Sequence, residues 1–305
     1  MFIEKRKQGK NIKYYLSHTF RENDKVKNIR RYLGQNLKEE EIIILQKQAE
    51  QYILKQVDGM KTEVFNFFLS TKQIAQLNKY DSKLKIIHLT KDQWKTFSED
   101  FVFNTNAIEG STVLLEEVKE ILNHKVIAKT FDEKETVGLS KAVDYIRNTK
   151  EKFSLKLILK LHELCFADTK SFAGKLRDVE VVIKDGKGEI VHRGAPKEIL
   201  KPEIEELILW YEENIKNFKP LVLASIIHNQ FEHIHPFQDG NGRVGRLLLN
   251  FILLQSKYPP INIFLEDRQE YYFTLREYSQ NGELKPTLEF LIKQYKKMLK
   301  KVTTK

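Results

Sequence analysis

The segment 235–246 constrains this chain more than any other part of the sequence. It reads HPFQDGNGRVGR and lies between two apolar stretches, 221–233 and 244–254. Apolar stretches on both sides predict two buried helices joined by a loop. The Gly-Asn-Gly run at 240–242 tolerates unusual backbone conformations, so several backbone N–H groups can converge where the second helix begins. Because a helix N-terminus favours negative charge, we expect this loop to bind a polyphosphate.

Four side chains add chemistry to the expected anion site. Arg243 and Arg246 lie one turn apart on the second helix, so we expect both to point to the same side. Asp239 would repel a phosphate unless a divalent cation lay between them, and magnesium commonly binds one carboxylate, phosphate oxygens and water. His235 is the one base of the segment that is neutral near pH 7, and it could take a proton from an incoming hydroxyl.

This segment resembles the signature of the Fic family, His-x-Phe-x-Asp/Glu-Gly-Asn-Gly-Arg-x-x-Arg, at every fixed position. A rival phosphate-binding motif, the P-loop, would need Gly-Lys-Ser/Thr, and the sequence contains none. Upstream, Thr105 to Gly110 reads TNAIEG and resembles the family's inhibitory motif, Ser/Thr-x-x-x-Glu-Gly/Asn. Thr105 and Glu109 are four residues apart and therefore share a helical face. The resemblance covers about two-thirds of the chain, from Trp94 to Leu299.

The resemblance implies a mainly α fold, a Fic-type helical bundle with a β-hairpin called the flap. It also implies an enzyme that transfers a nucleoside monophosphate, most often AMP from the co-substrate ATP with Mg²⁺, to a Ser, Thr or Tyr hydroxyl of a target protein or of itself. In this scheme one arginine draws out the leaving pyrophosphate, and the other binds the γ-phosphate or the inhibitory glutamate. The resemblance assigns catalysis to His235; nucleotide binding to Gly240, Asn241, Gly242, Arg243, Arg246 and one of Tyr271 and Tyr272; the metal to Asp239; inhibition to Thr105, Glu109 and Gly110; and substrate binding on the flap to Val181, Val182 and Ile183.

Composition and charge limit the other classes of protein. The chain has 305 residues, 41% hydrophobic and 31% charged, which is ordinary for a soluble globular protein. No apolar run approaches the ~18 residues of a membrane span, and the single cysteine, Cys165, fits a reducing cytoplasm and a buried position. Residues 1–34 carry ten Lys/Arg against three acids, which gives +7 of the net +10. A basic segment of this kind could contact nucleic acid or simply face solvent.

Three regions are expected along the chain. Residues 1–34 alternate as a small antiparallel β-meander, residues 35–89 form a helical region, and residues 90–300 form the catalytic domain with its inhibitory helix. The apolar spacing predicts helices at 42–57 and 64–77 and a helix over 90–108 that Thr90 and Gln93 cap. Asp132 and Glu135 are expected to cap the helix to residue 147, and 179–192 reads as a hairpin around Asp185-Gly186-Lys187-Gly188.

Several alternatives remain open at this point. The same scaffold could transfer UMP, phosphate or phosphocholine, or Glu109 could position a water that removes AMP. The chain could also be a binding module whose N-terminal sheet engages nucleic acid, and it could form a homodimer. His228, His233 and His235 raise the question of zinc, but their spacing of five and two residues does not match His-Glu-x-x-His.

Overall fold

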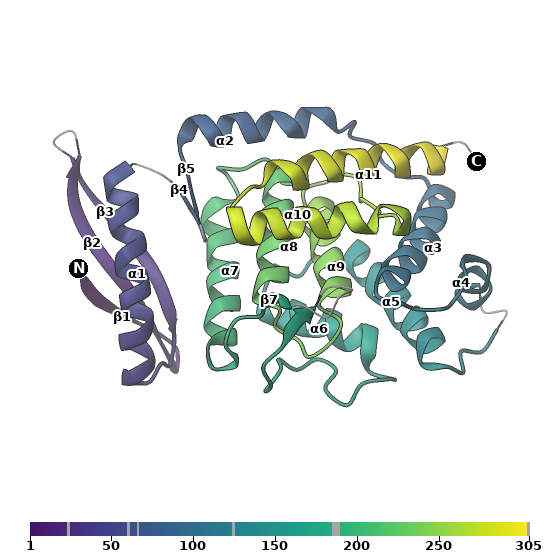
Figure 1. Cartoon of the computed structure of the whole chain (residues 1–305), viewed down its shortest axis with the longest axis horizontal. Helices are drawn as coiled ribbons and strands as arrows, with labels where there is room; N and C mark the ends of the chain where they lie inside the picture. The colour runs from purple at the N-terminus through teal and green to yellow at the C-terminus, as the bar shows by residue number, and fades with distance from the viewer. Residues whose placement is uncertain (23–24, 60–61, 66, 124–125, 185–189, 304–305) are drawn as a thin grey trace.

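The computed structural model describes residues 1–22, 25–59, 62–65, 67–123, 126–184 and 190–303. Figure 1 shows a three-stranded sheet with one helix at one end and a large helical body beside it. The strands are β1 (Phe2–Gln8), β2 (Asn11–Glu22), β3 (Lys25–Gln35), β4 (Thr62–Val64), β5 (Phe67–Leu69), β6 (Val182–Lys184) and β7 (Ile190–Arg193). The α-helices are α1 (Glu39–Gly59), α2 (Thr71–Asn78), α3 (Lys91–Ile108), α4 (Leu115–Leu122), α5 (Phe131–Asn148), α6 (Leu155–Phe166), α7 (Leu200–Asn214), α8 (Pro220–Ile234), α9 (Asn241–Gln255), α10 (Arg268–Asn281) and α11 (Lys285–Thr303).

The N-terminal sheet is the predicted antiparallel meander, with strand order β1-β2-β3. The alternation along β2 places Tyr14 and Leu16 on the face that α1 covers, where they join Leu33 of β3 and Leu45 and Ile53 of α1 in a small core. A register shift between Tyr14 and Tyr15 bends the middle strand. The sheet therefore obtains from α1 the apolar support that a meander of this size lacks alone.

An ion-paired junction connects this sheet to the helical body. Arg31 of β3 contacts Glu63 of β4, and its second terminal nitrogen lies 2.7 Å from Glu206 of α7. The guanidinium also lies over the ring of Tyr52 at 4.3 Å. Burial raises the pKa of Glu63 to about 7, so this acid binds a proton more readily than usual. Arg31 is the positive charge beside it. The nucleic-acid contact considered for residues 1–34 stays a prediction.

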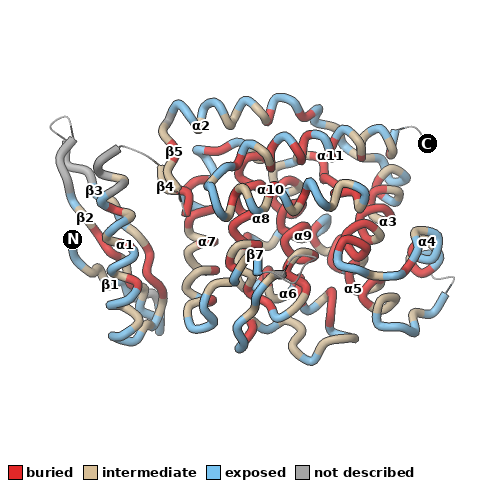
Figure 2. Tube along the Cα trace, viewed as in Figure 1, coloured by how far each residue is buried: buried red, intermediate tan, exposed pale blue. Residues whose placement is uncertain are grey.

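The helical body is centred on α8 and α9, which are buried almost throughout and which Figure 2 shows among the most deeply buried segments. Apolar side chains on every side of α9, such as Leu247, Ile252 and Leu253, are no more than 1% exposed. The other helices pack around this pair and so fix the loop between them. Within the described residues, no helix is long and apolar enough to cross a membrane.

Two predictions about local structure are wrong. The expected helix over 64–77 is instead the hairpin β4–β5 followed by α2, which Ser70 and Gln73 cap. The cap of α5 is Thr130, paired with Glu133, and not Asp132 with Glu135. The capping box at Thr90, in contrast, is confirmed.

Candidate active site

The loop between α8 and α9 is held rigidly by side chains on both sides. His235 ends α8 in the left-handed conformation, with φ 53°, and its carbonyl accepts a 2.8 Å hydrogen bond from Nε of Arg177. The Asn241 side chain accepts from the backbone N–H of Phe237 at 2.8 Å and donates to its carbonyl at 2.7 Å. Phe237 is fully buried and stacks on His162 with ring centroids 3.9 Å apart. The buried Phe237 ring therefore anchors the loop, and the Asn241 amide closes the loop while its backbone stays at the helix N-terminus.

Glycine is required at position 240, where α9 begins. Gly240 has φ 85°, and a Cβ there would lie 2.3 Å from the ring of Phe166. The backbone N–H groups after Gly240 belong to the first turn of α9. These donors and the helix dipole together favour an anion at this point.

The candidate base has a defined tautomer. Nδ1 of His235 lies 3.3 Å from the carbonyl oxygen of Glu232, and since a carbonyl can only accept, Nδ1 carries the hydrogen. Nε2 is then the nitrogen that accepts a proton. Burial lowers the pKa of His235 to about 4, so the imidazole is neutral at pH 7. A neutral ring with Nε2 available can act as a general base.

The inhibitory motif meets the signature directly. Arg246 Nε donates to the Thr105 hydroxyl at 2.7 Å, and Nη2 donates to the Thr105 carbonyl at 2.9 Å and to Glu109 Oε1 at 2.7 Å. Arg246 is 1% exposed, and burial opposes its charge, but Glu109, Tyr271 and Glu232 together outweigh burial and raise the pKa of the guanidinium. Gly110 follows with φ 97°, which lets the chain turn away after α3.

Glu109 lies where a phosphate would approach the helix. A Cβ on Gly242 would be 2.2 Å from Glu109 Oε1 and 3.0 Å from Arg246 Nη1. Because glycine carries no side chain, the carboxylate reaches the first turn of α9, where the backbone donors and a full positive charge meet. The carboxylate therefore occupies an anion site.

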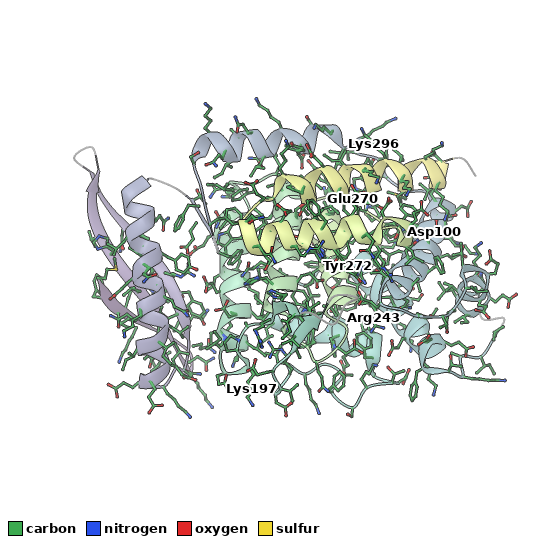
Figure 3. The ribbon with its side chains drawn as sticks, viewed as in Figure 1. Asp100, Lys197, Arg243, Glu270, Tyr272 and Lys296 are labelled. Carbon is green, nitrogen blue, oxygen red and sulfur yellow. The ribbon has the colours of Figure 1, made fainter. Side chains whose placement is uncertain are left out.

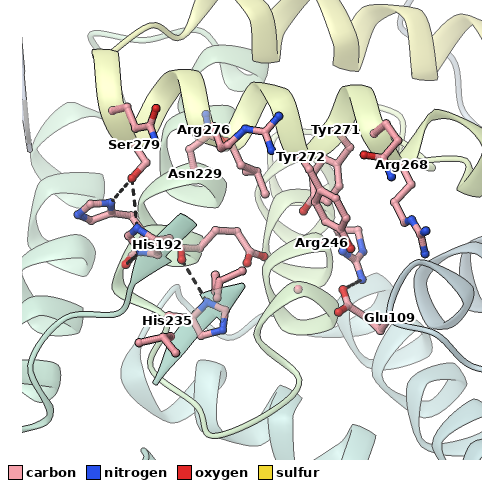
Figure 4. Close-up of a pocket in the computed structure, with 18 residues that line it drawn as sticks. Glu109, His192, Asn229, His235, Arg246, Arg268, Tyr271, Tyr272, Arg276 and Ser279 are labelled. Atoms are coloured by element: carbon pink, nitrogen blue, oxygen red, sulfur yellow. Dashed lines mark hydrogen bonds and ion pairs between the residues drawn. The ribbon is translucent and has the colours of Figure 1, made fainter. Parts of the chain in front are cut away.

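One cavity of about 540 Å³ brings these groups together. In Figure 4, His235 lies on one side of it and the ion pair of Glu109 and Arg246 on another, with residues of α10 above. The described residues that line the cavity include Glu109, Val182, Ile183, His192, Asn229, Glu232, His233, His235, Gly242, Arg246, Tyr271, Tyr272, Arg276 and Ser279. A volume of this size suits a small-molecule ligand.

Asp239 is held by two cations, one of which the sequence did not reveal. Its Oδ2 lies 3.0 Å from Lys170 Nζ, and its Oδ1 lies 3.4 Å from Arg243 Nη2. Burial favours the neutral acid, but Arg243 and Lys170 outweigh it and lower the pKa of Asp239. Because its pKa is lowered, Asp239 is an ionised carboxylate at pH 7. Its side chain is 45% exposed and already pairs with a cation. This donor fits magnesium bound through one carboxylate, water and phosphate oxygens.

The two arginines of α9 do not point to the same side, so that prediction is wrong. Arg243 contacts Glu135 of α5 and lies over the Phe166 ring at 4.4 Å, whereas Arg246 contacts α3. Figure 3 labels Arg243 below Tyr272 of α10; Arg243 is buried but does not line the cavity. Sequence reasoning missed Glu135 as its partner, because the two residues are 108 positions apart.

The structure distinguishes the two tyrosines that the sequence left open. Tyr271 is 2% exposed, and its hydroxyl lies 3.0 Å from His228 Nε2, with its ring 5.7 Å from the Arg246 guanidinium. Tyr272 is only partly buried, and its hydroxyl donates to the Ile108 carbonyl at 3.3 Å. Tyr272 therefore presents more of its ring to the cavity, while the buried Tyr271 ring packs against Arg246.

The flap is tied to the end of α8. Its strands β6 and β7 are antiparallel, with Val182 opposite Arg193 and a register shift between Ile183 and Lys184. The predicted turn at 185–188 lies outside the described residues. Val182 and Ile183 line the cavity, and Val181 immediately precedes the strand. On β7, His192 Nε2 donates to the His233 carbonyl at 2.7 Å.

The three histidines of the zinc alternative have separate partners. His228 contacts Tyr271, His233 Nδ1 lies 3.0 Å from the Ser279 hydroxyl, and His235 donates to a backbone carbonyl. Across the described part of the chain, no three His, Cys, Asp or Glu side chains are arranged to hold a metal ion. These contacts account for the histidines without zinc.

Known proteins share both the sequence and the fold of this region. The protein adenylyltransferase Fic of Nematostella vectensis is 28% identical over 199 residues, which cover 62% of this chain and 45% of that protein. The protein adenylyltransferase fic-1 of Caenorhabditis briggsae is 31% identical over 203 residues, 63% of this chain and 39% of that protein. This chain thus spans less than half the length of these relatives.

Solved structures show the same fold. Fic-1 (residues 134–508) from C. elegans superposes with a TM-score of 0.62 at 23% identity, covering 88% of this chain and 78% of that one. A Fic family protein from Desulfovibrio desulfuricans gives a TM-score of 0.65 at 23% identity, covering 76% and 73%. IbpAFic2 covalently tethered to Cdc42 gives 0.51 at 18% identity, covering 85% and 79%. Residues 152–253 match the model of the Fic/DOC family, so this chain contains a Fic/DOC family domain.

Proposed function

We propose that this chain is a protein adenylyltransferase that moves AMP from ATP to a Ser, Thr or Tyr hydroxyl. In this proposal Glu109 inhibits the enzyme. One observation carries the proposal. The Glu109 carboxylate is bound to Arg246 at the N-terminus of α9, in the same cavity as the neutral base His235. Relatives at 28–31% identity that are named protein adenylyltransferases support it.

The proposed chemistry needs one proton transfer and one displacement. Nε2 of His235 takes the hydroxyl proton as the hydroxyl oxygen bonds to the α-phosphorus, and pyrophosphate leaves with its electron pair. The backbone N–H groups of Asn241 and Gly242 would bind the phosphates and stabilise the developing charge, while the Gly240 N–H donates to Asp239 Oδ1 at 2.6 Å in this structure. Asp239 would hold magnesium, which would neutralise phosphate charge, and this carboxylate is paired with Lys170 in the present structure. Contact between Arg243 and the pyrophosphate stays a prediction, since that side chain is paired with Glu135 here.

Inhibition follows from competition for one guanidinium. Arg246 binds either the γ-phosphate or Glu109, and while Glu109 is bound the triphosphate cannot extend to its full length along α9. The α-phosphate is then misaligned for in-line attack, and a small misplacement is costly because the reaction depends on orientation. Of the two tyrosines, Tyr272 is the better candidate for contact with the adenine base of ATP.

The acceptor is a protein segment in this proposal. The exposed edge of β6, with Val182 and Ile183 beside the cavity, could pair with an extended peptide and place its hydroxyl near His235. IbpAFic2, which shares the fold, is tethered to the protein Cdc42. The identity of the target, self-modification and a homodimer remain predictions.

The choice of donor can be tested directly. Glu109→Gly protein is incubated with labelled ATP, UTP or CDP-choline and magnesium, and the covalent label is measured. We expect label from α-labelled ATP and none from CDP-choline; label from another donor alone would replace the proposal by that transfer. To test removal of AMP, wild-type protein is added to the labelled variant, and loss of AMP mass would indicate that Glu109 supports hydrolysis.

A further inference from the structure

Arg246 has more hydrogen-bonding capacity than its partners use. Its Nε and Nη2 are bound to Thr105 and Glu109, but Nη1 has no partner among the described residues. In the proposed function Glu109 must withdraw before a nucleotide can reach this guanidinium. A buried cation that loses its counter-ion is strongly destabilising. Some other group must therefore balance Arg246 in the interval between release and nucleotide binding.

A second carboxyl group approaches Arg246 from α8. Glu232 is 9% exposed, lines the cavity, and its Oε1 has no hydrogen-bond partner among the described residues. A Cβ on Gly245 would lie 2.2 Å from this oxygen, just as a Cβ on Gly242 would lie 2.2 Å from Glu109 Oε1. Two glycines three residues apart on α9 thus make room for two carboxyl groups beside one arginine.

The groups around Glu232 set its protonation. Four ionisable residues lie around Glu232. They are Arg246 of α9, Glu109 at the end of α3, Tyr271 of α10 and His228 of α8, the helix that also carries Glu232. Burial raises the pKa of Glu232 to about 8, Arg246 acts in the opposite direction, and the charge of Glu109 adds to the rise. While Glu109 is in place, Glu232 is mostly a neutral acid at pH 7, so the two carboxyl groups do not repel each other fully.

We propose that Glu232 is a reserve counter-ion for Arg246: when Glu109 withdraws, Glu232 releases its proton to solvent and its carboxylate pairs with Nη1 of the guanidinium. Nη1 of Arg246 and Oε1 of Glu232 both lack a hydrogen-bond partner among the described residues, and no ion pair joins these two side chains while Glu109 is bound. This exchange keeps Arg246 at the cavity and makes release of the inhibitory glutamate less costly. Glu232 is a positioning residue, since it acts on the phosphate site through Arg246. The inference rests on the proposed function only in that a nucleotide is what displaces Glu109.

The titration of Glu232 tests this exchange without any nucleotide. Protein labelled with ¹³C at glutamate carboxyl carbons is titrated by NMR, and the Glu232 signal is identified by its loss in Glu232→Gln. We expect Glu109→Gly to lower the midpoint of Glu232 by about one unit or more, because a neighbouring negative charge is gone and Arg246 is unshared. Glu109→Gln, which keeps the side-chain size, should shift it in the same direction, and the exposed Glu116→Gln on α4 should not shift it.

A midpoint that is unchanged or higher in both Glu109 variants would overturn the inference. Loss of the Glu109 charge alone would lower the midpoint whether or not Glu232 pairs with Arg246, so the shift is also measured between Arg246→Met and Glu109→Gly/Arg246→Met. A shift that is equally large without the guanidinium would likewise overturn the inference. Since no nucleotide is present, the outcome is separate from that of the proposed function. A midpoint that falls further with Arg246 than without it, in a variant that takes no label from ATP, would support the counter-ion role and contradict AMP transfer.

Discussion

Replacing Glu109 by glycine should turn Arg246 from an occupied group into an available phosphate-binding group. The pair is joined at 2.7 Å, the guanidinium is 1% exposed and the carboxylate 31% exposed. Charge centres about 4 Å apart attract by roughly 4 kcal/mol at an effective dielectric of about 20. Because solvent reaches the carboxylate, we retain about half, or ~2 kcal/mol. An incoming γ-phosphate must break this pair, so its removal should strengthen ATP binding about thirtyfold.

Calorimetry with a non-hydrolysable ATP analogue and magnesium measures this difference between wild type and Glu109→Gly. ADP, which lacks the γ-phosphate, is the matched ligand and should gain far less. Glycine is tolerated at this position because Glu109 ends α3 as its cap and the next residue is already Gly110. If the two proteins bind the ATP analogue equally, or if ADP gains as much, then Glu109 does not compete with the γ-phosphate.

Three further predictions concern stability. Phe237→Ala should lower the free energy of unfolding by about 3–5 kcal/mol in urea titration, since the ring is fully buried. Burial would raise the pKa of Asp267, but hydrogen bonds from α11, including one from Lys297, lower this pKa to about 2. The stabilisation from Asp267 is therefore present above the unfolded pKa near 4 and fades as the pH falls toward 2. Asp267→Asn should lower the thermal midpoint at pH 7 and have a smaller effect near pH 2. Arg31→Met should loosen the N-terminal sheet, because Glu63 and its acidic neighbours lose their counter-ion; limited proteolysis between α1 and β4 should accelerate, and more so at higher pH.

Local sequence signals identified the helices around the signature correctly. The apolar stretches on both sides of 235–246 are long enough to specify buried helices, and the Gly-Asn-Gly run leaves few alternatives to a helix N-terminus. Thr90 and Gln93 marked the start of α3, and Gly110 marked its end. That Glu109 meets Arg246 across 137 residues came from the family resemblance and not from any local signal.

Where local patterns were ambiguous, the prediction failed. Val64, Phe67 and Phe68 fit a helical spacing by coincidence, while the left-handed Phe65, with φ 52°, makes the tight turn of a two-stranded hairpin. Asp132 could cap a helix, but in the fold it accepts a 2.9 Å hydrogen bond from the backbone of Thr112 instead. Thr130 and Asp132 can both cap a helix, and the sequence does not say which one does so until distant partners such as Thr112 are known.

The missed site residues share one physical reason. Lys170, Glu135 and Glu232 lie on helices or loops with several polar residues, and periodicity alone does not say which of these faces the site. Lys170 pairs with Asp239 and Glu135 with Arg243, both far away in sequence, and Glu232 lies near Arg246. Only the packing of α5, α6 and α8 around α9 selects them.

The central claim is that His235 catalyses transfer of AMP and that Glu109 restrains it. Intact mass after incubation with ATP and magnesium tests this most directly, with wild type, Glu109→Gly and the double variant Glu109→Gly/His235→Ala. The account predicts a gain of AMP on Glu109→Gly, little on wild type and none on the double variant. An equal gain on all three, or a gain on the double variant that matches Glu109→Gly, would contradict the roles assigned to both residues.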